Sequence, residues 1–417
     1  MIPEVLFRII LAFVLIGFFL DRLLSWLNSR SWAEEIPESM KDYYEKEKYL
    51  EARAYDRANS NLSMVSSVYG LVLILFMLFF DGFAFVDEVV RSVTENTYFM
   101  PVLFFGILLL ASDILNLPFS LYSTFVIEEK FGFNKMGPTL YFMDKLKTYV
   151  LAVVIGLPLL VVFIWLYDHF GKDFWIPLWV VISGISIFMA MFYTSIIVPV
   201  FNKLDPLEDC ELRQSIEEYC QGVGFELSNI YVMDGSKRSS KTNAYFSGLG
   251  ARKNIVLFDT LIEKHDTDEI VSILAHEVGH YKMKHVRTSV MISALQSGFM
   301  LFLLSTMINS EVLGLALGVK KMSLHIGLIA FSLLYSPVST IFGIGMNVLS
   351  RRNEYQADAF AARTFAPESM IRALKKLSVD NLSNLFPHPA YVFVNYSHPP
   401  VLKRISAIEK LNAISES

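Results

Sequence analysis

Hydrophobic residues are concentrated in seven long blocks that alternate with polar connections. Each block approaches the roughly 20 residues that an α-helix needs to cross a bilayer. We therefore expect a mostly α-helical protein whose seven transmembrane helices form a bundle. The predicted spans are residues 5–26, 62–80, 99–126, 148–167, 174–200, 289–307 and 324–347.

The third span is interrupted by polar residues and by Pro118, so a tilted or broken helix is expected there. Asp113 lies in its middle. An ionisable side chain is costly in hydrocarbon, so Asp113 should face a polar interior or pair with a neighbouring helix.

Composition agrees with a membrane protein, because 53% of residues are hydrophobic and only 18% are charged. Soluble domains average about 25% charged residues. The net charge of −5 and the lack of a basic stripe argue against nucleic-acid binding. Cys210 and Cys220 fit no CxxC spacing and are predicted to be free thiols.

Lysine and arginine are concentrated in the first and third connections between the spans. Since basic loops stay on the cytoplasmic side, the N-terminus is predicted to lie outside or in a lumen. The long polar connection 201–288 and the C-terminus would then be cytoplasmic. We expect four parts: spans one to five in 1–200, a polar region in 201–288, spans six and seven in 289–349, and a C-terminal region in 350–417.

The polar region 201–288 shows helical and strand patterns in turn. Glu211–Tyr219 has helical periodicity, and three short β-like runs predict a small sheet. Asp266 and Glu269 have the spacing of a helix-opening capping box. The helix that they open is predicted to continue unbroken to about Lys284 and into the sixth span. The expected strands are Ile230–Met233, Asn243–Ser247 and Asn254–Phe258.

The candidate chemistry begins in this helix, with the string Leu274–His280. His276 and His280 are one helical turn apart, so both imidazoles can reach one zinc ion. Glu277 would point beside the metal, where a carboxylate can hold the attacking water and accept its proton. The spacing therefore predicts a zinc hydrolase with His276 and His280 as ligands and Glu277 as the base.

A third ligand is required, and several positions can be compared. The metzincin pattern is excluded, because Met283 and Val286 stand where glycine and histidine are needed. On an unbroken helix His285 would lie about 140° around from His280, facing away from the metal. We therefore interpret His285 as a residue flanking the membrane.

The better candidate follows the seventh span on the same side. Glu354 and Asp358 are again one helical turn apart. Glu354 can complete a His₂Glu site, and Asp358 can accept the free N–H of a ligating histidine. The alternative is a pair of surface acids beside a basic membrane flank.

These residues resemble those of the type I CAAX prenyl proteases, membrane zinc peptidases that mature prenylated proteins. The resemblance covers nearly the whole chain. It implies a water-filled chamber enclosed by the seven helices, one zinc ion per subunit, and a prenylated protein or peptide as substrate. The strings that carry it, besides the two motifs, are Ala52–Arg57, Glu128–Asn134, Asn243–Phe246 and Ser397–Pro400 with Arg404.

Physical roles can be proposed for the smaller strings. Asn243, Ala244 and Tyr245 resemble an edge strand that binds the substrate main chain, although a plain structural strand is the alternative. His398 would donate a hydrogen bond to the oxyanion, unless it is only a turn residue; Tyr245 is another candidate for that task. Arg404 would hold His398, Glu354 or substrate in place, or be a solvated charge.

Three functions remain open from the sequence. The first is an endopeptidase that removes the last three residues after a prenylated cysteine. The second is a membrane-protein quality-control protease like the HtpX-type enzymes, which are shorter and have fewer spans. The third is a non-catalytic transporter or scaffold, which the intact HExxH string disfavours. The oligomeric state is left open, and a monomer is compatible with every hypothesis.

Overall fold

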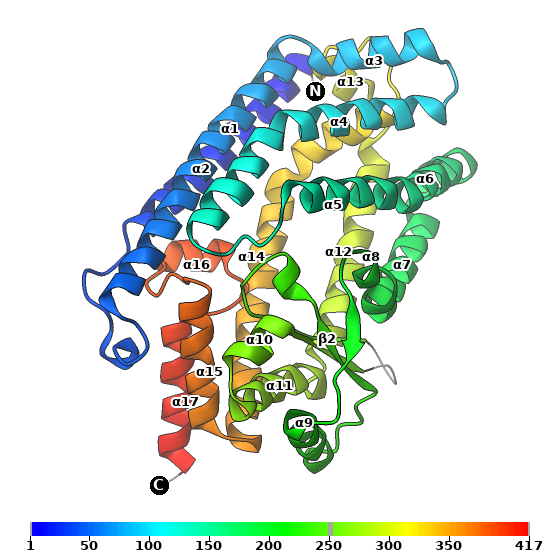
Figure 1. Cartoon of the computed structure of the whole chain (residues 1–417). Helices are drawn as coiled ribbons and strands as arrows, with labels where there is room; N and C mark the ends of the chain where they lie inside the picture. The colour runs from blue at the N-terminus through cyan, green and yellow to red at the C-terminus, as the bar shows by residue number, and fades with distance from the viewer. Residues whose placement is uncertain (1, 249–252, 416–417) are drawn as a thin grey trace.

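A computed structural model describes residues 2–248 and 253–415 of the chain (Figure 1). It contains seven helices that are long and apolar enough to cross a membrane. Five of the seven predicted spans lie within these helices, and the other two, 62–80 and 174–200, extend beyond them by one residue. The helices are α1 (Pro3–Ser29), α2 (Lys46–Phe79), α4 with a π-helical end (Phe99–Glu128), α5 with α6 (Pro138–Asp173), α7 with α8 (Trp175–Phe201), α12 (His285–Met307) and α14 (Leu324–Thr364).

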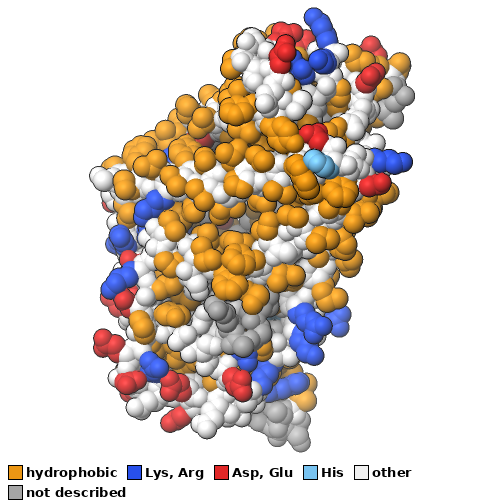
Figure 2. Space-filling model, turned by 90° about the vertical axis from the view of Figure 1, so that its right-hand side faces the viewer, with side chains coloured by type: hydrophobic (Ala, Val, Ile, Leu, Met, Phe, Trp, Pro, Cys, Tyr) orange, Lys and Arg blue, Asp and Glu red, His pale blue; other side chains and the backbone are white. Residues whose placement is uncertain are grey.

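The long helices leave most of their apolar side chains uncovered by protein. In the most apolar window of α2 only 6% of residues are buried. Figure 2 shows the result as a broad hydrophobic band, with charged side chains gathered above and below it. Soluble proteins rarely expose apolar patches of this extent, so the band is the surface that lipid tails cover.

Two of the spans continue as helices well beyond the predicted hydrocarbon boundary. α2 begins at Lys46, and α14 ends at Thr364, far past residue 347. A continuous α-helix satisfies its own backbone hydrogen bonds, so a change from apolar to polar side chains need not end it. At 1.5 Å per residue α14 is about 60 Å long. It therefore carries residues from the far end of the bundle into the polar region.

The polar regions form a second body at one end of the bundle, where the C-terminus also lies (Figure 1). Its helices are α9 (Glu211–Gly222), α10 (Asp259–Lys264), α11 (Thr267–Lys282), α15 (Pro367–Asp380), α16 (Pro389–Asn395) and α17 (Val401–Ser415). Two further helices, α3 (Gly82–Val93) and α13 (Glu311–Ala316), join spans at the opposite end.

A four-stranded sheet lies in this body with the order β1-β2-β4-β3. β2 and β4 are parallel, and the outer strands pair antiparallel to them. All three expected strands are present, and β3 occupies an edge, as predicted. β1 is only three residues long and was not predicted. The strands are β1 (Leu204–Pro206), β2 (Asn229–Met233), β3 (Ala244–Ser247) and β4 (Asn254–Phe258).

The capping box of α11 is confirmed, because Asp266 accepts the Glu269 N–H at 3.0 Å and Glu269 accepts the Asp266 N–H. The expected continuous helix into the sixth span is wrong. α11 ends at Lys282, Lys284 has a positive φ of 61°, and α12 starts afresh at His285. One left-handed residue therefore changes the chain direction between the polar body and the membrane.

Two smaller expectations concern isolated polar residues. Asp113 pairs with Lys145 on α5 at 2.7 Å, which is the neighbouring-helix alternative. Both cysteines are free, as predicted. Burial raises the pKa of the Cys220 thiol to about 11, so this group stays protonated and unreactive at neutral pH.

α11 packs closely against α14, and a glycine makes this possible. A Cβ on Gly279 would lie 3.2 Å from Ala357 Cα and 3.2 Å from Phe360 Cβ. Ala357 is itself fully buried. The two helix backbones therefore approach as closely as their atoms allow, at the level where the candidate metal ligands stand.

Replacing Gly279 by alanine should push these helices apart. We expect Gly279→Ala to lower the unfolding free energy by about 1–3 kcal/mol and to reduce the bound metal. Thermal unfolding in detergent and metal analysis measure both. Gly343→Ala on the partner helix α14 is the control, since a Cβ there meets nothing within 4 Å. Equal metal content and melting temperature in the two variants would contradict the close-packing argument.

Candidate metal centre

α11 presents His276 and His280 on one face, as their spacing requires. Their Nε2 atoms lie 3.1 Å apart. His276 is buried and His280 partly so. Glu277, between them, is also partly exposed. The helix is fixed by its capping box and by a core of apolar side chains, so both rings are held on a rigid element.

Glu354 reaches the same point from α14. Its carboxylate oxygens lie 3.4 Å from His276 Nε2 and 3.2 Å from His280 Nε2. One ligand atom from each of the three residues lies within 4.8 Å of the others. The structure thus brings together the three residues that were predicted as ligands from separate parts of the chain.

Asp358 stands behind His276, as predicted. Its Oδ1 lies 2.8 Å from His276 Nδ1, and since a carboxylate is an acceptor, Nδ1 carries the proton. The Nε2 atom of His276 then faces Glu354, at 3.4 Å, and His280, at 3.1 Å. Burial lowers the pKa of His276, but the bonds to Asp358 and Glu354 outweigh it and raise the pKa to about 9. The pocket therefore favours positive charge.

Arg404 holds Asp358 with two hydrogen bonds, at 2.8 and 2.6 Å. Burial lowers the pKa of Arg404, but Asp358 more than compensates and raises it, so the guanidinium stays charged. Its Nη1 lies 3.7 Å from Glu354. Of the alternatives weighed from the sequence, these contacts favour a supporting role at the carboxylates over a solvated charge.

His285 is the functional residue that the sequence reasoning misplaced. It is buried, and its Nδ1 lies 3.1 Å from His280 Nδ1. Its Nε2 lies 3.0 Å from Gln356 Oε1. The prediction that His285 faces away assumed one unbroken helix, and the turn at Lys284 removes that assumption. His285 thus supports His280 as Asp358 supports His276.

The donor set fits a metal ion. If Gln356 accepts from His285 Nε2, then His285 Nδ1 accepts the proton on His280 Nδ1. In the metal-binding form, each ligand histidine then carries its proton on Nδ1, which donates to Asp358 or His285, and its Nε2 lone pair is free to bind the metal. Two inward lone pairs and one carboxylate match a His₂Glu site with an open position. The partners behind the ligands also fix the ring orientations.

His398 lies at the exposed side of this cluster. Its Nδ1 is 2.9 Å from Glu354, while 64% of its side chain is accessible to solvent. Asn243, which precedes the edge strand β3, is exposed, and its Oδ1 accepts the Ala244 N–H at 2.9 Å. Tyr245, on β3, is partly buried and packs edge-on against Phe258.

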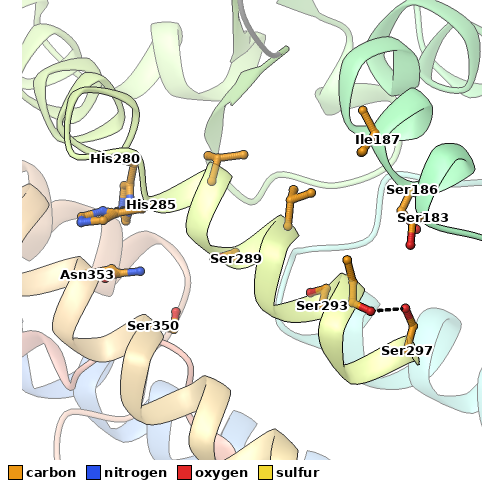
Figure 3. A pocket seen from close by; sticks show the side chains of 13 residues that line it. Ser183, Ser186, Ile187, His280, His285, Ser289, Ser293, Ser297, Ser350 and Asn353 are labelled. Carbon is orange, nitrogen blue, oxygen red and sulfur yellow. Dashed lines mark hydrogen bonds between the residues drawn. The ribbon is translucent and has the colours of Figure 1, made fainter. Parts of the chain in front are cut away.

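A cavity of about 520 Å³ leads from the cluster into the bundle. Figure 3 shows His280 and His285 side by side at one end, with Ser350 and Asn353 of α14 near them. Hydroxyl groups from α7 and α12 line the rest, together with apolar side chains. The lining serines are Ser183, Ser186, Ser289, Ser293, Ser297 and Ser350.

Seven membrane-spanning helices that deliver a His₂Glu cluster, with a glutamate between the histidines, define an integral-membrane metallopeptidase. Comparison with protein families agrees. Residues 26–203 match the model described as "CAAX prenyl protease N-terminal, five membrane helices". Residues 206–412 match "Peptidase family M48". The chain belongs to peptidase family M48, among the CAAX prenyl proteases, as the sequence resemblance predicted.

Individual relatives match over nearly their whole length. CAAX prenyl protease 1 of Saccharomyces cerevisiae is 35% identical over 98% of this chain and 96% of its own. The Homo sapiens homologue is 31% identical over 90% and 89%. The crystal structure of S. mikatae Ste24p superimposes with a TM-score of 0.92 at 34% identity, covering 97% of this chain and 99% of that one.

The contact between His285 and His280 yields a prediction about metal affinity. We expect His285→Ala to weaken the binding of added Zn²⁺ about 10–100-fold, because the His280 ring loses its support. Competition with a chromogenic chelator measures the affinity. His169→Ala is the control, since His169 is exposed at the end of α6, where it contacts the carbonyl and the ring of Trp165 and lies apart from the metal ligands. Unchanged affinity in His285→Ala would mean that His285 does not position the ligand.

Proposed function

We propose that the metal is zinc, held by His276, His280 and Glu354, one ion per subunit. Two imidazoles and one carboxylate are a common ligand set of catalytic zinc. When bound, zinc would supply Lewis-acid polarisation of the scissile carbonyl and of water. All three ligands come from one chain, so a monomer suffices for activity.

Glu277 is the proposed catalytic base. It lies between the ligands and is partly exposed, so its carboxylate is open to the substrate side. It would take a proton from the attacking water and pass it to the leaving amine nitrogen. General acid–base catalysis of this kind contributes about 10²–10⁴-fold in rate. Asp358 would position His276, because its Oδ1 lies 2.8 Å from His276 Nδ1.

His398 is the proposed donor to the oxyanion. Its exposed ring stands over the Glu354 side of the cluster, within reach of a carbonyl bound there. Arg404 was placed among the substrate-binding residues from the sequence. Its contacts to Asp358 support a different proposal, in which it positions the carboxylate that holds His276.

β3 is the proposed substrate-binding strand. Among the described strands it pairs with β4 on one side only, and it packs against α7 and α11. A peptide could add to the other side by main-chain hydrogen bonds, with Asn243 reaching a peptide carbonyl and Ala244 and Tyr245 forming the edge. This position lies between the metal-bearing helix and the spans.

The proposed substrate is a protein with a prenylated C-terminal CAAX sequence, cut after the lipidated cysteine. Relatives named CAAX prenyl protease 1 match along nearly the whole chain. The cavity beside the metal site supports this proposal, because it joins apolar side chains to the hydroxyls. Broad membrane-protein proteolysis is the second candidate, and it uses the same site.

The proposed topology follows the distribution of lysine and arginine. It places the N-terminus outside or in a lumen, and regions 201–288 and 350–417 in the cytoplasm, where they form the catalytic unit. Regions 1–200 and 289–349 form the membrane part. The position of the C-terminus at the same end as α11 supports this division (Figure 1).

The first test compares wild type with Glu277→Gln. The amide cannot accept the proton but keeps the size of the side chain, so we expect equal zinc and a loss of at least about 10³-fold in kcat/KM. The assay measures cleavage of a farnesylated CAAX peptide beside its unlipidated twin. Equal cleavage of both peptides would move the function to general proteolysis. Full activity in Glu277→Gln would remove the proposed base.

A second test addresses His398. We expect His398→Ala to keep its zinc and to lose about 10²–10³-fold in kcat with little change in KM, because an oxyanion donor acts in the transition state. His169→Ala again controls for the loss of one exposed imidazole. A main effect on KM, or loss of zinc, would instead make His398 a binding or structural residue.

A further inference from the structure

A second cavity, remote in sequence from the metal ligands, lies between α1 and α2. Its volume is about 630 Å³. Three arginines, Arg22, Arg53 and Arg57, line it, against one carboxylate, Asp56. Asp56 already accepts a hydrogen bond from Trp32 Nε1 at 2.9 Å. The cavity therefore carries an excess of positive charge.

The three guanidinium groups have few partners within the described chain, and Arg22 Nη1 donates one long hydrogen bond to Ser63 Oγ at 3.4 Å. Among residues 2–248 and 253–415, none of them forms an ion pair with a carboxylate. The Nε of Arg22 is buried without a hydrogen-bond partner in the described chain. A buried donor left unsatisfied is costly, so an acceptor at this position would stabilise the arrangement. Guanidinium groups bind phosphate oxygens in a bidentate manner.

The cavity also has an apolar side. Phe19, Leu23 and Met64 line it and are 64%, 52% and 50% exposed. These three lie inside the predicted spans, whereas Arg53 and Arg57 lie in the polar extension of α2 below residue 62. The cavity thus crosses the boundary between hydrocarbon and headgroups, and Trp26 stands there as interfacial tryptophans do.

From this arrangement we propose that the cavity between α1 and α2 binds one phospholipid with an anionic headgroup. The phosphate lies against Arg22, Arg53 and Arg57, and the acyl chains lie on Phe19, Leu23 and Met64. A free phosphate would use the arginines but would leave the apolar side uncovered. A zwitterionic lipid has no net negative charge, so it would leave the excess positive charge of the site unbalanced.

The test measures binding to the full-length protein in uncharged detergent by native mass spectrometry. The probes are phosphatidylserine, phosphatidylcholine and inorganic phosphate. We expect phosphatidylserine to bind at least about tenfold more tightly than phosphatidylcholine, because basic residues attract anionic headgroups. The triple variant Arg22→Gln, Arg53→Gln, Arg57→Gln should lose this preference. Peptidase activity is not the readout, so the outcome is independent of the proposed function.

Two further variants keep the test decisive. The triple change of the same arginines to lysine preserves charge and should retain a reduced preference, because lysine lacks the planar fork. Changing three exposed lysines, Lys46, Lys237 and Lys410, to glutamine should leave the preference intact. Wild-type affinity for phosphatidylserine in the glutamine variant of the arginines would overturn the proposal. Displacement of phosphatidylserine by inorganic phosphate at the same concentration would also overturn it.

Discussion

The metal centre depends on the close contact between α11 and α14. His276 and His280 stand on the first helix and Glu354 on the second, so the interhelical distance sets the ligand geometry. Gly279 permits that distance, because any side chain there would meet the backbone of Ala357. The rest of the polar body supports the two helices from outside. α15 and α17 pack beside α14, while the sheet and α9 pack beside α11. A small displacement at one glycine would therefore be felt at every ligand.

Charge balance is the second constraint on this region. Two buried carboxylates, Glu354 and Asp358, lie beside the guanidinium of Arg404, whose side chain is 13% exposed. Buried charges are tolerated when they are paired, and Arg404 is committed to Asp358 by two hydrogen bonds. Glu354 faces the Nε2 atoms of two imidazoles. A divalent cation bound here would supply further positive charge and give all three groups a common partner, which would couple metal binding to the assembly of the site.

The sequence was informative wherever a local rule decided the structure. Length and hydropathy located the seven spans, and the one-turn spacing of His276 with His280 and of Glu354 with Asp358 identified the cluster. The capping box marked the start of α11 because side chain and backbone interact within one turn.

The prediction failed in the region after Lys282. No glycine or proline signals a break there, and lysine rarely takes a positive φ, so a continuous helix was the natural expectation. The contact between His285 and His280 depends on that turn, so it could not be predicted without it. The arrangement of Arg404 around Asp358 is equally non-local, since no spacing rule connects them.

The order of the ligands along the chain has a consequence for how the enzyme is made. His276 and His280 precede α12, whereas Glu354 and Asp358 follow the apolar part of α14. Two complete spans must therefore be synthesised and inserted between the first ligands and the last. Until α14 has been made, the nascent chain carries the two histidines without their carboxylates. The cluster of His276, His280 and Glu354 therefore cannot be complete before the last span has been synthesised.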